Sequence, residues 1–179
     1  MEQAYADYLA ALLKKREMPI HCVSLIAHIK NSKQAMKGES EVSDQETFEG
    51  FKQKLVDKNE EKYGAEIRAK YGEAEVDESN ANLMGLTKEQ YAKSERLRAA
   101  YESALKAAFE EGDPAGARAH EACDLHRQWL CIFYPKYSKH YHRGLAELYR
   151  ADERFKVNFE KLAVGCTEFF CNAINAYCK

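Results

Sequence analysis

A proline inside a long helical pattern, Pro135, constrains the fold of this chain more than any other residue. Because proline has no backbone N–H and restricts the residue before it, the preceding helix must end near Tyr134. Ser138 can then cap a new helix that carries His142 and Tyr149 on one face. The sequence therefore predicts two helices that meet at a corner.

The residues around this corner have an unusual composition. The stretch from His126 to Tyr149 contains the only tryptophan of the chain, three of its six histidines and four of its eleven tyrosines. Aromatic rings with polar tips suit a pocket that holds a mostly apolar ligand and orients it through a few hydrogen bonds. A packed corner with its tyrosines half in water fits the same composition and is the commoner case. The candidate ligand-binding residues are His126, Trp129, Phe133, Tyr134, Tyr137, Tyr141, His142 and Tyr149.

The first 37 residues differ from the rest of the chain. Residues 3–16 and 22–36 each carry a narrow apolar stripe at helical spacing, and a polar linker follows at residues 38–44. Two helices with narrow apolar stripes cannot form a core of their own, so they are predicted to be coiled-coil-type helices that pack on a partner. We therefore expect the chain to form a homodimer through residues 1–37. A helical hairpin folded onto its own domain is an equal alternative. The second domain is then predicted to span residues 43–179.

Helix start and stop signals divide this second domain. Ser43 and Thr87 each begin a capping box, with Glu or Gln three residues later. The helix that starts after Thr87 keeps its apolar period up to Gly112, a typical C-terminal stop. Asp113, followed by Pro114, is predicted to cap the next helix.

The remaining segments complete an all-α prediction. Residues 77–86 are rich in turn-forming side chains and are predicted to be a short connection. Asp152 is expected to cap a short helix, and a last helix is expected at about residues 162–177. No segment alternates polar and apolar residues as a half-buried strand would.

Charge and composition exclude several classes of protein. With 27 Lys and Arg against 29 Asp and Glu, the chain lacks the basic footprint of an autonomous nucleic-acid binder. We find neither a signal peptide nor a run of 18 apolar residues, so we expect a cytoplasmic protein that does not contact the membrane. The six cysteines form no CxxC pair and are expected to be free thiols in a reducing compartment.

Metal and enzyme chemistry are weaker interpretations. His120, Cys123 and His126 are spaced so that they could share a helical face, but a structural zinc site usually needs a fourth ligand. A hydrolase or transferase would pair Cys123 or Cys131 with His126, yet nothing marks an oxyanion hole or an orienting third group. Haem has no CxxCH motif here. We therefore predict a binding module with no catalytic residue, no metal and no cofactor.

Three blocks of the sequence resemble a known family. They are LHRQWLCIFYP at Leu125–Pro135, HYHRGLAELYRADERF at His140–Phe155 and FEGFKQKLVDKNEEKYGAEIRAKYG at Phe48–Gly72. They are similar to the TipAS family, the antibiotic-recognition domain of transcription regulators of the MerR class. The pattern HxGLxELYxxDxRF is specific, because a generic helix does not require this combination at one place.

The resemblance implies a globin-like all-α domain, without haem, that folds around peptide-like antibiotics such as thiopeptides. It also implies either the effector part of a MerR-type regulator or a free-standing resistance protein that sequesters drug. Residues 1–37 are similar to the helix that joins such a domain to a winged-helix DNA reader, so DNA is expected to bind only through a reader outside this chain. Where the family often places a cysteine that captures the ligand, this chain has Tyr137, which implies stacking in place of covalent capture.

Overall fold

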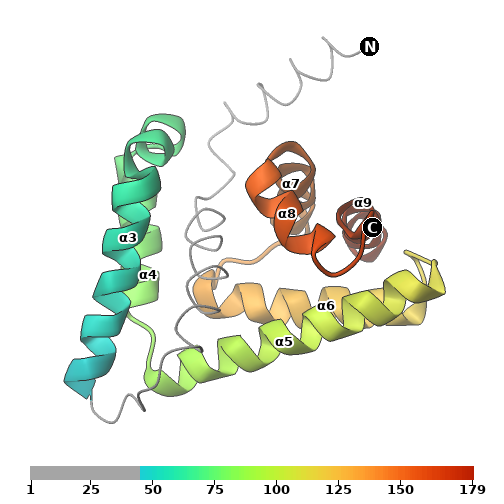
Figure 1. The fold of residues 1–179 in the computed structure, drawn as a ribbon, viewed down its shortest axis with the longest axis horizontal. Helices are drawn as coiled ribbons and strands as arrows, with labels where there is room; N and C mark the ends of the chain where they lie inside the picture. Colours follow the sequence, from blue (N-terminus) through green and yellow to red (C-terminus); the bar gives the residue numbers. More distant parts are fainter. Residues whose placement is uncertain (1–44) are drawn as a thin grey trace.

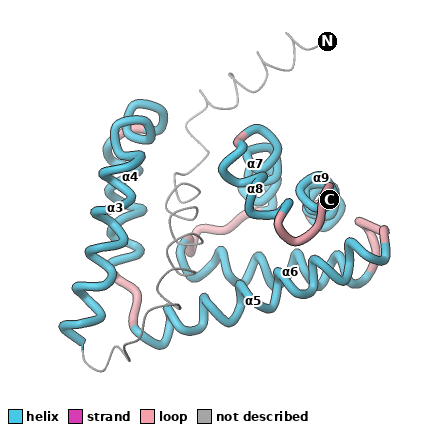
Figure 2. Tube along the Cα trace, viewed as in Figure 1, coloured by secondary structure: helices cyan, strands magenta, loops and turns pink. Residues whose placement is uncertain are grey.

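The computed structural model describes residues 45–179, and this part of the chain consists of helices and connections without a strand (Figures 1 and 2). The all-α prediction is therefore confirmed for these residues. The expected dimerisation helices at residues 1–37 and the capping box at Ser43 lie outside the described residues. The helices are α3 (Gln45–Tyr71), α4 (Glu73–Met84), α5 (Lys88–Glu111), α6 (Ala117–Phe133), α7 (Lys139–Ala151), α8 (Glu153–Glu160) and α9 (Cys166–Tyr177).

A pair of long antiparallel helices, α5 and α6, forms the base of the domain, and α7, α8 and α9 cover one side of it (Figure 1). The core lies where these helices meet. Leu105 of α5, Leu130 of α6, Leu145 of α7 and Phe170 of α9 are at most 1% exposed. Burying side chains of this size is the main source of stability in such a helical domain. The helices α3 and α4 pair with each other at the opposite end of the base (Figure 1).

Local signals set most helix ends as predicted. The Thr87 hydroxyl accepts a hydrogen bond from the Gln90 amide at 3.1 Å, and the Gln90 side chain accepts one from the Thr87 amide at 2.8 Å. Gly112 ends α5 in the left-handed conformation, with φ 79°. Asp152 caps α8 by accepting from the Arg154 amide at 2.9 Å. These caps satisfy backbone groups that the helices themselves leave unpaired.

The predicted cap at Asp113 is wrong. Helix α6 begins at Ala117, and its N-cap is Gly116. The Asp113 carboxylate instead accepts from the Ala115 amide at 2.9 Å, which makes a turn two residues long. Asp side chains favour such local turns. Because the Asp113 carboxylate accepts its hydrogen bond within this turn, it does not cap α6.

The connection predicted at residues 77–86 is also wrong, because most of it belongs to helix α4. This segment places Val76, Ser79 and Leu83 on one buried face. Gly72, with φ 99°, separates α4 from α3, and Gly85 ends α4. Packing of this face outweighs the turn preference of the Asp, Ser and Asn residues in the segment, because tertiary contacts routinely override propensity.

A buried lysine joins α3 to the end of α4. Lys52 is 1% exposed, and its ammonium donates to the backbone carbonyls of Met84 and of Leu86, the latter at 2.9 Å. It also pairs with Glu49 at 2.9 Å. A cation at the Met84 carbonyl satisfies an acceptor that α4 leaves unpaired and complements the negative end of the helix dipole, and its bond to Leu86 fixes the connection that follows α4.

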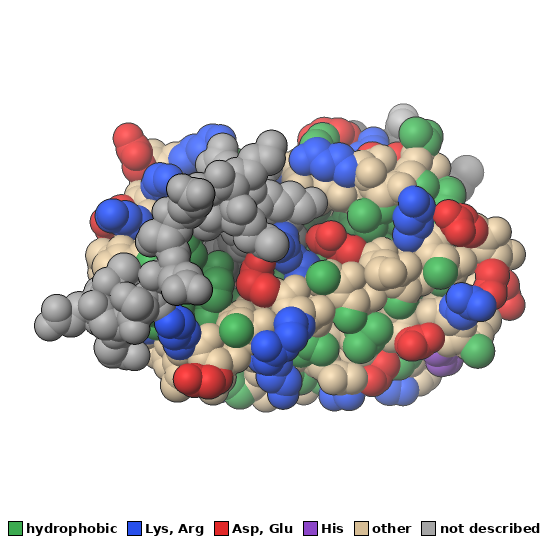
Figure 3. Space-filling view, turned by 60° about the horizontal axis from the view of Figure 1, so that its bottom comes forward, with side chains coloured by type: hydrophobic (Ala, Val, Ile, Leu, Met, Phe, Trp, Pro, Cys, Tyr) green, Lys and Arg blue, Asp and Glu red, His purple; other side chains and the backbone are tan. Residues whose placement is uncertain are grey.

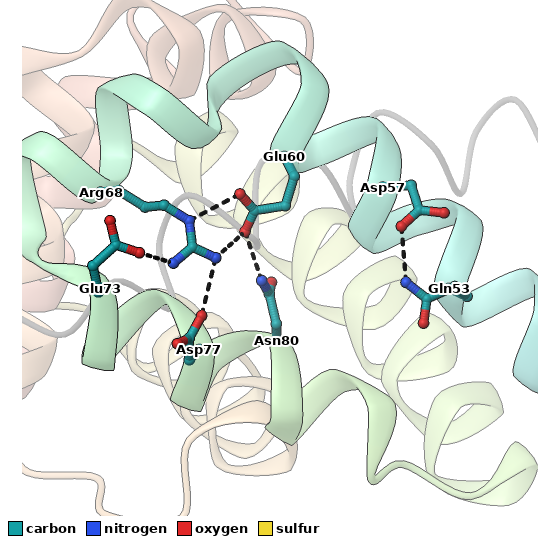
Figure 4. A network of polar contacts seen from close by, with 7 residues as sticks. All are labelled: Gln53, Asp57, Glu60, Arg68, Glu73, Asp77 and Asn80. Atoms are coloured by element: carbon teal, nitrogen blue, oxygen red, sulfur yellow. Dashed lines mark hydrogen bonds and ion pairs between the residues drawn. The ribbon is translucent and has the colours of Figure 1, made fainter.

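A second link between α3 and α4 is an ion network around Arg68 (Figure 4). The guanidinium of Arg68 contacts Glu60 of its own helix at 2.9 Å, Asp77 of α4 at 3.0 Å and also Glu73 of α4. Asn80 of α4 donates to the same Glu60 carboxylate at 2.8 Å. Several charges held in one network fix helix geometry better than an isolated surface pair does.

One face of the molecule carries both signs of charge side by side (Figure 3). On the face drawn in Figure 3, basic and acidic side chains are interspersed between apolar ones. Within residues 45–179 no helix is both long and apolar enough to cross a membrane.

Candidate ligand-binding site

The corner at Pro135 forms as the sequence predicts. Helix α6 ends at Phe133, and Tyr134 is its C-cap. Ser138 begins α7, where its hydroxyl accepts from the Tyr141 amide at 3.0 Å. The turn between the two helices presents Tyr137 to α7, so that its hydroxyl reaches His142.

A chain of hydrogen bonds crosses the core from this turn. The Tyr137 hydroxyl lies 3.0 Å from Nδ1 of His142, and Nε2 of His142 lies 2.9 Å from Nδ1 of His126. On the far side, Nε2 of His126 lies 3.3 Å from the Tyr149 hydroxyl. Both histidines are fully buried, at 0% exposure. We call these four residues the histidine relay.

Burial keeps the two imidazoles of the relay neutral. Loss of solvation lowers the pKa of His126 well below its ordinary value, and the neighbouring His142 lowers it further. The pKa of His142 falls to about 3, first through burial and then through the nearby charge of Arg127. A neutral imidazole has one donor nitrogen and one acceptor nitrogen. Each histidine therefore uses both ring nitrogens within the relay.

A cluster of polar side chains from α6 and α9 borders the relay. The Tyr177 hydroxyl donates to the Asp124 carboxylate at 2.8 Å, and Nε of Arg127 donates to Asp124 at 2.9 Å. The Arg127 guanidinium lies over the Tyr137 ring, 6.0 Å from its centroid. The Cys178 thiol lies beside the Tyr137 hydroxyl, and each affects the pKa of the other. Arg127, Tyr137 and Tyr177 are partly exposed, so this is the solvent-facing side of the corner.

The other predicted site residues build the wall behind this side. The Trp129 ring packs 5.6 Å from Phe133, and the Tyr134 ring packs 4.5 Å from Tyr141. Of the eight candidate residues, two are partly exposed, Tyr134 and Tyr137. The other six are buried, namely His126, Trp129, Phe133, Tyr141, His142 and Tyr149. The corner is thus a packed aromatic unit whose outer surface is formed by the two partly exposed tyrosines.

Sequence reasoning missed several neighbours of the site. Tyr101 of α5 and Phe170 of α9 each place their rings 5.0 Å from His126. Tyr177 and Cys178 reach the corner only because α9 packs against α6 and α7. The pair of Asp124 and Arg127, three residues apart, was the one signal that the sequence offered, since this spacing places both on one helical face.

The geometry separates the candidate metal ligands and disfavours Cys123 as a nucleophile. His120 is exposed and packs on Tyr177, whereas Cys123 and His126 are buried. Across residues 45–179, no three side chains of the metal-binding types come together. Burial raises the pKa of the Cys123 thiol, which is the opposite of what an activated nucleophile needs.

A family model described as the TipAS antibiotic-recognition domain matches residues 63–177, which include the whole corner. This chain belongs to the TipAS family. The family match confirms the resemblance that the central sequence blocks indicated.

Two curated relatives of this TipAS-family chain are transcription regulators. The HTH-type transcriptional activator mta of Bacillus subtilis (strain 168) is 23% identical over 169 residues, which cover 93% of this chain and 63% of that protein. The HTH-type transcriptional regulator SkgA of Caulobacter vibrioides (strain NA1000 / CB15N) is 24% identical over 190 residues, which cover 100% of this chain and 72% of that protein. No solved structure gave a significant match.

Proposed function

We propose that this TipAS-family chain is the ligand-binding effector domain of a MerR-type transcription regulator and binds peptide-like or multidrug-type antibiotics of the thiopeptide kind. The observation that carries the proposal is the outer surface of the corner, where Tyr134, Tyr137 and Arg127 face solvent above a fully buried pair of histidines. Rings and a planar cation offer stacking surfaces, and the hydroxyls offer hydrogen bonds. The two relatives named as transcription regulators support the regulatory part.

The roles of the candidate residues follow from their depth. Tyr137 and Tyr134 would contact the ligand directly, while Trp129 and Phe133 would form the apolar wall beneath them. His142 would orient polar groups of the ligand through Tyr137, because the imidazole is buried and bonded to that hydroxyl. A rigid aromatic wall lowers the entropy that a ligand loses on binding.

Ligand binding is tested with the fluorescence of Trp129, the only tryptophan of the chain. Titration with thiostrepton, a thiopeptide, is expected to change this signal and saturate. Tyr137→Ala should weaken binding by about 1–3 kcal/mol, the usual cost of removing an aromatic anchor. The matched control is Tyr91→Ala, since Tyr91 is also partly exposed but packs on Phe48 and Phe51 of α3. If thiostrepton and related peptides bind no better than to an unrelated helical protein, the proposal fails.

Binding is expected to be reversible. Tyr137 cannot add to a dehydroamino acid as a thiol would, and Cys178 beside it is buried, with its pKa raised by that burial. Mass spectrometry after denaturation should therefore show the unmodified mass of the chain. A stable adduct on any cysteine would contradict the non-covalent mode.

The regulatory proposal assigns DNA binding to a reader domain outside these residues. Because both signs of charge are interspersed on the face drawn in Figure 3 and the net charge is −2, this chain alone is expected to show no sequence-specific binding to duplex DNA. A mobility-shift assay with operator-type duplexes at two salt concentrations measures this. Tight, salt-dependent binding to a single sequence would contradict it.

A further inference from the structure

The four members of the histidine relay have hydrogen-bond roles that depend on one another. In the central link, Nδ1 of His126 faces Nε2 of His142 at 2.9 Å, so one of these two nitrogens carries the proton and the other accepts it. If Nδ1 of His126 is protonated, Nε2 of His142 must be bare. Because a neutral imidazole carries one proton, His142 is then protonated at Nδ1. The link therefore forces both histidines into the same tautomer.

This rule leaves two states of the relay. When both imidazoles are protonated at Nδ1, His142 donates to the Tyr137 oxygen, and the Tyr149 hydroxyl donates to His126. When both are protonated at Nε2, every bond is reversed: Tyr137 donates to His142, and His126 donates to Tyr149. Hydroxyl groups permit both states, because each is both a donor and an acceptor.

The two states differ at the solvent-facing end. In the Nδ1 state, the Tyr137 oxygen already accepts from His142, and its O–H is directed away, towards the Cys178 thiol or towards a ligand acceptor. In the Nε2 state, the O–H is used by His142, and the oxygen lone pairs can accept from a ligand N–H. To go from the first state to the second, each proton crosses its own hydrogen bond towards Tyr137. Tyr137 releases its former proton to water, and Tyr149 receives one from water during a local opening.

We propose that the relay matches the Tyr137 hydroxyl to either a carbonyl or an N–H group of an amide-rich ligand, with His126 and Tyr149 as positioning residues. This inference rests on the proposed function in one respect only, the presence of a ligand at Tyr137. Such a relay would let one site accept chemically different ligands, because the protein supplies the complementary hydrogen-bond partner by a shift of protons and every side chain has the same position in both states.

The relay is tested in the ligand-free chain of 179 residues by long-range ¹H–¹⁵N correlation NMR of the imidazole nitrogens, which distinguishes the tautomers. In the wild type, His126 and His142 must report the same tautomer. Tyr149→Phe should place both protons on Nδ1, because the alternative leaves a buried N–H of His126 without a partner, and orphaned N–H groups are rarer than orphaned acceptors. By the same reasoning, Tyr137→Phe should place both on Nε2.

The informative signals are those two links away from each substitution: His142 in Tyr149→Phe, and His126 in Tyr137→Phe. A merely structural role of the tyrosines would not reverse these tautomers. The control is Tyr101→Phe, which removes a hydroxyl from a ring 5.0 Å from His126 that is in no link of the relay, and it should leave the wild-type tautomers unchanged. Different tautomers on the two histidines in one sample, or the same tautomers in both end variants, would overturn the relay.

The ligand-facing part has its own test. Tyr149→Phe should change the dissociation constant of thiostrepton by about fivefold, the effect of one altered hydrogen bond, although Tyr149 lies at the buried end of the relay. A dissociation constant that does not change in Tyr149→Phe would overturn this part. The control Tyr101→Phe should bind thiostrepton as the wild type does. The NMR measurement needs no ligand. A wild-type chain that obeys the tautomer rule but does not bind thiostrepton thus refutes the proposed function and leaves the relay standing.

Discussion

Acidification should destabilise this domain through its two buried histidines. His126 and His142 are fully buried, and burial lowers the pKa of both side chains well below the ordinary value. A histidine with a lowered pKa in the folded state binds fewer protons folded than unfolded. The free energy of unfolding must therefore decrease as pH falls from about 6.5, the pKa in the unfolded chain, towards the pKa of the folded state.

The size of the effect follows from this linkage. A histidine that stays neutral when folded and has a pKa of about 6.5 when unfolded loses about 2 kcal/mol between pH 7 and pH 5. The pair should therefore lose about 4 kcal/mol, a large share of the stability of a domain of this size. Urea unfolding followed by circular dichroism at both pH values measures the loss.

Comparison with a variant that lacks both histidines separates their contribution to the pH dependence from that of other titrating groups. His126→Gln combined with His142→Gln keeps polar side chains but removes both titrating groups, so its free energy of unfolding should lose about 4 kcal/mol less than that of the wild type. Acidic groups such as Glu160, whose pKa is lowered by hydrogen bonds from Thr167 and Gly165, titrate in both proteins alike. His140→Gln, at an exposed position of α7, is the control for replacing a histidine that is not in the relay. A wild-type loss equal to that of the double variant would refute the reasoning.

Three further predictions concern the parts of the chain outside the corner. Lys52→Ala should lower the free energy of unfolding by about 1–3 kcal/mol, because two backbone carbonyls lose their buried donor. Lys54 is exposed, so Lys54→Ala should change this free energy little. Equal effects of the two variants in urea unfolding would contradict this. Gly112→Ala should lower the free energy of unfolding by about 1–2 kcal/mol, because Gly112 has a φ of 79°. At Gly50 an added Cβ meets no neighbouring atom, so Gly50→Ala should raise the free energy of unfolding by about 0.5–1 kcal/mol. The Gly112→Ala protein should therefore melt at a lower temperature than the wild type, and the Gly50→Ala protein at a higher one. Deletion of residues 1–37 should leave a folded monomer, and a dimer that persists in sedimentation would disprove the proposed role of this segment.

Local chemistry was predictable from the sequence wherever a few adjacent residues decide the outcome. Pro135 ends a helix by removing a donor, and Thr87, Ser138 and Asp152 cap helices through amides two or three residues away. The predicted cap at Asp113 was wrong because a local turn, in which the Ala115 amide donates to the Asp113 carboxylate, competes with the cap. The family resemblance supplied the identity of the domain.

What the sequence could not provide depends on how the helices pack. Helix α4 carries turn-forming residues and is a helix because its buried face packs on α3. His126 and His142 were both candidates, yet their hydrogen bond to each other depends on the packing of α6 and α7 on α9, which no local pattern indicates. Tyr177 is 50 residues from Arg127, and no local pattern indicates that their side chains meet.

The ion network around Arg68 makes the two ends of the molecule respond differently to ionic strength. Its partners on α4 are well exposed, Glu73 at 74% and Asp77 at 66%, so their attraction to Arg68 is screened when the Debye length falls to about 3 Å in 1 M salt. Helices α5 to α9 are held by buried apolar side chains, which sulfate strengthens because it is excluded from protein surfaces. Concentrated sulfate should thus strengthen apolar contacts in both parts of the domain but weaken the ionic links between α3 and α4, so helices α5 to α9 should gain more stability from it than the α3–α4 pair does.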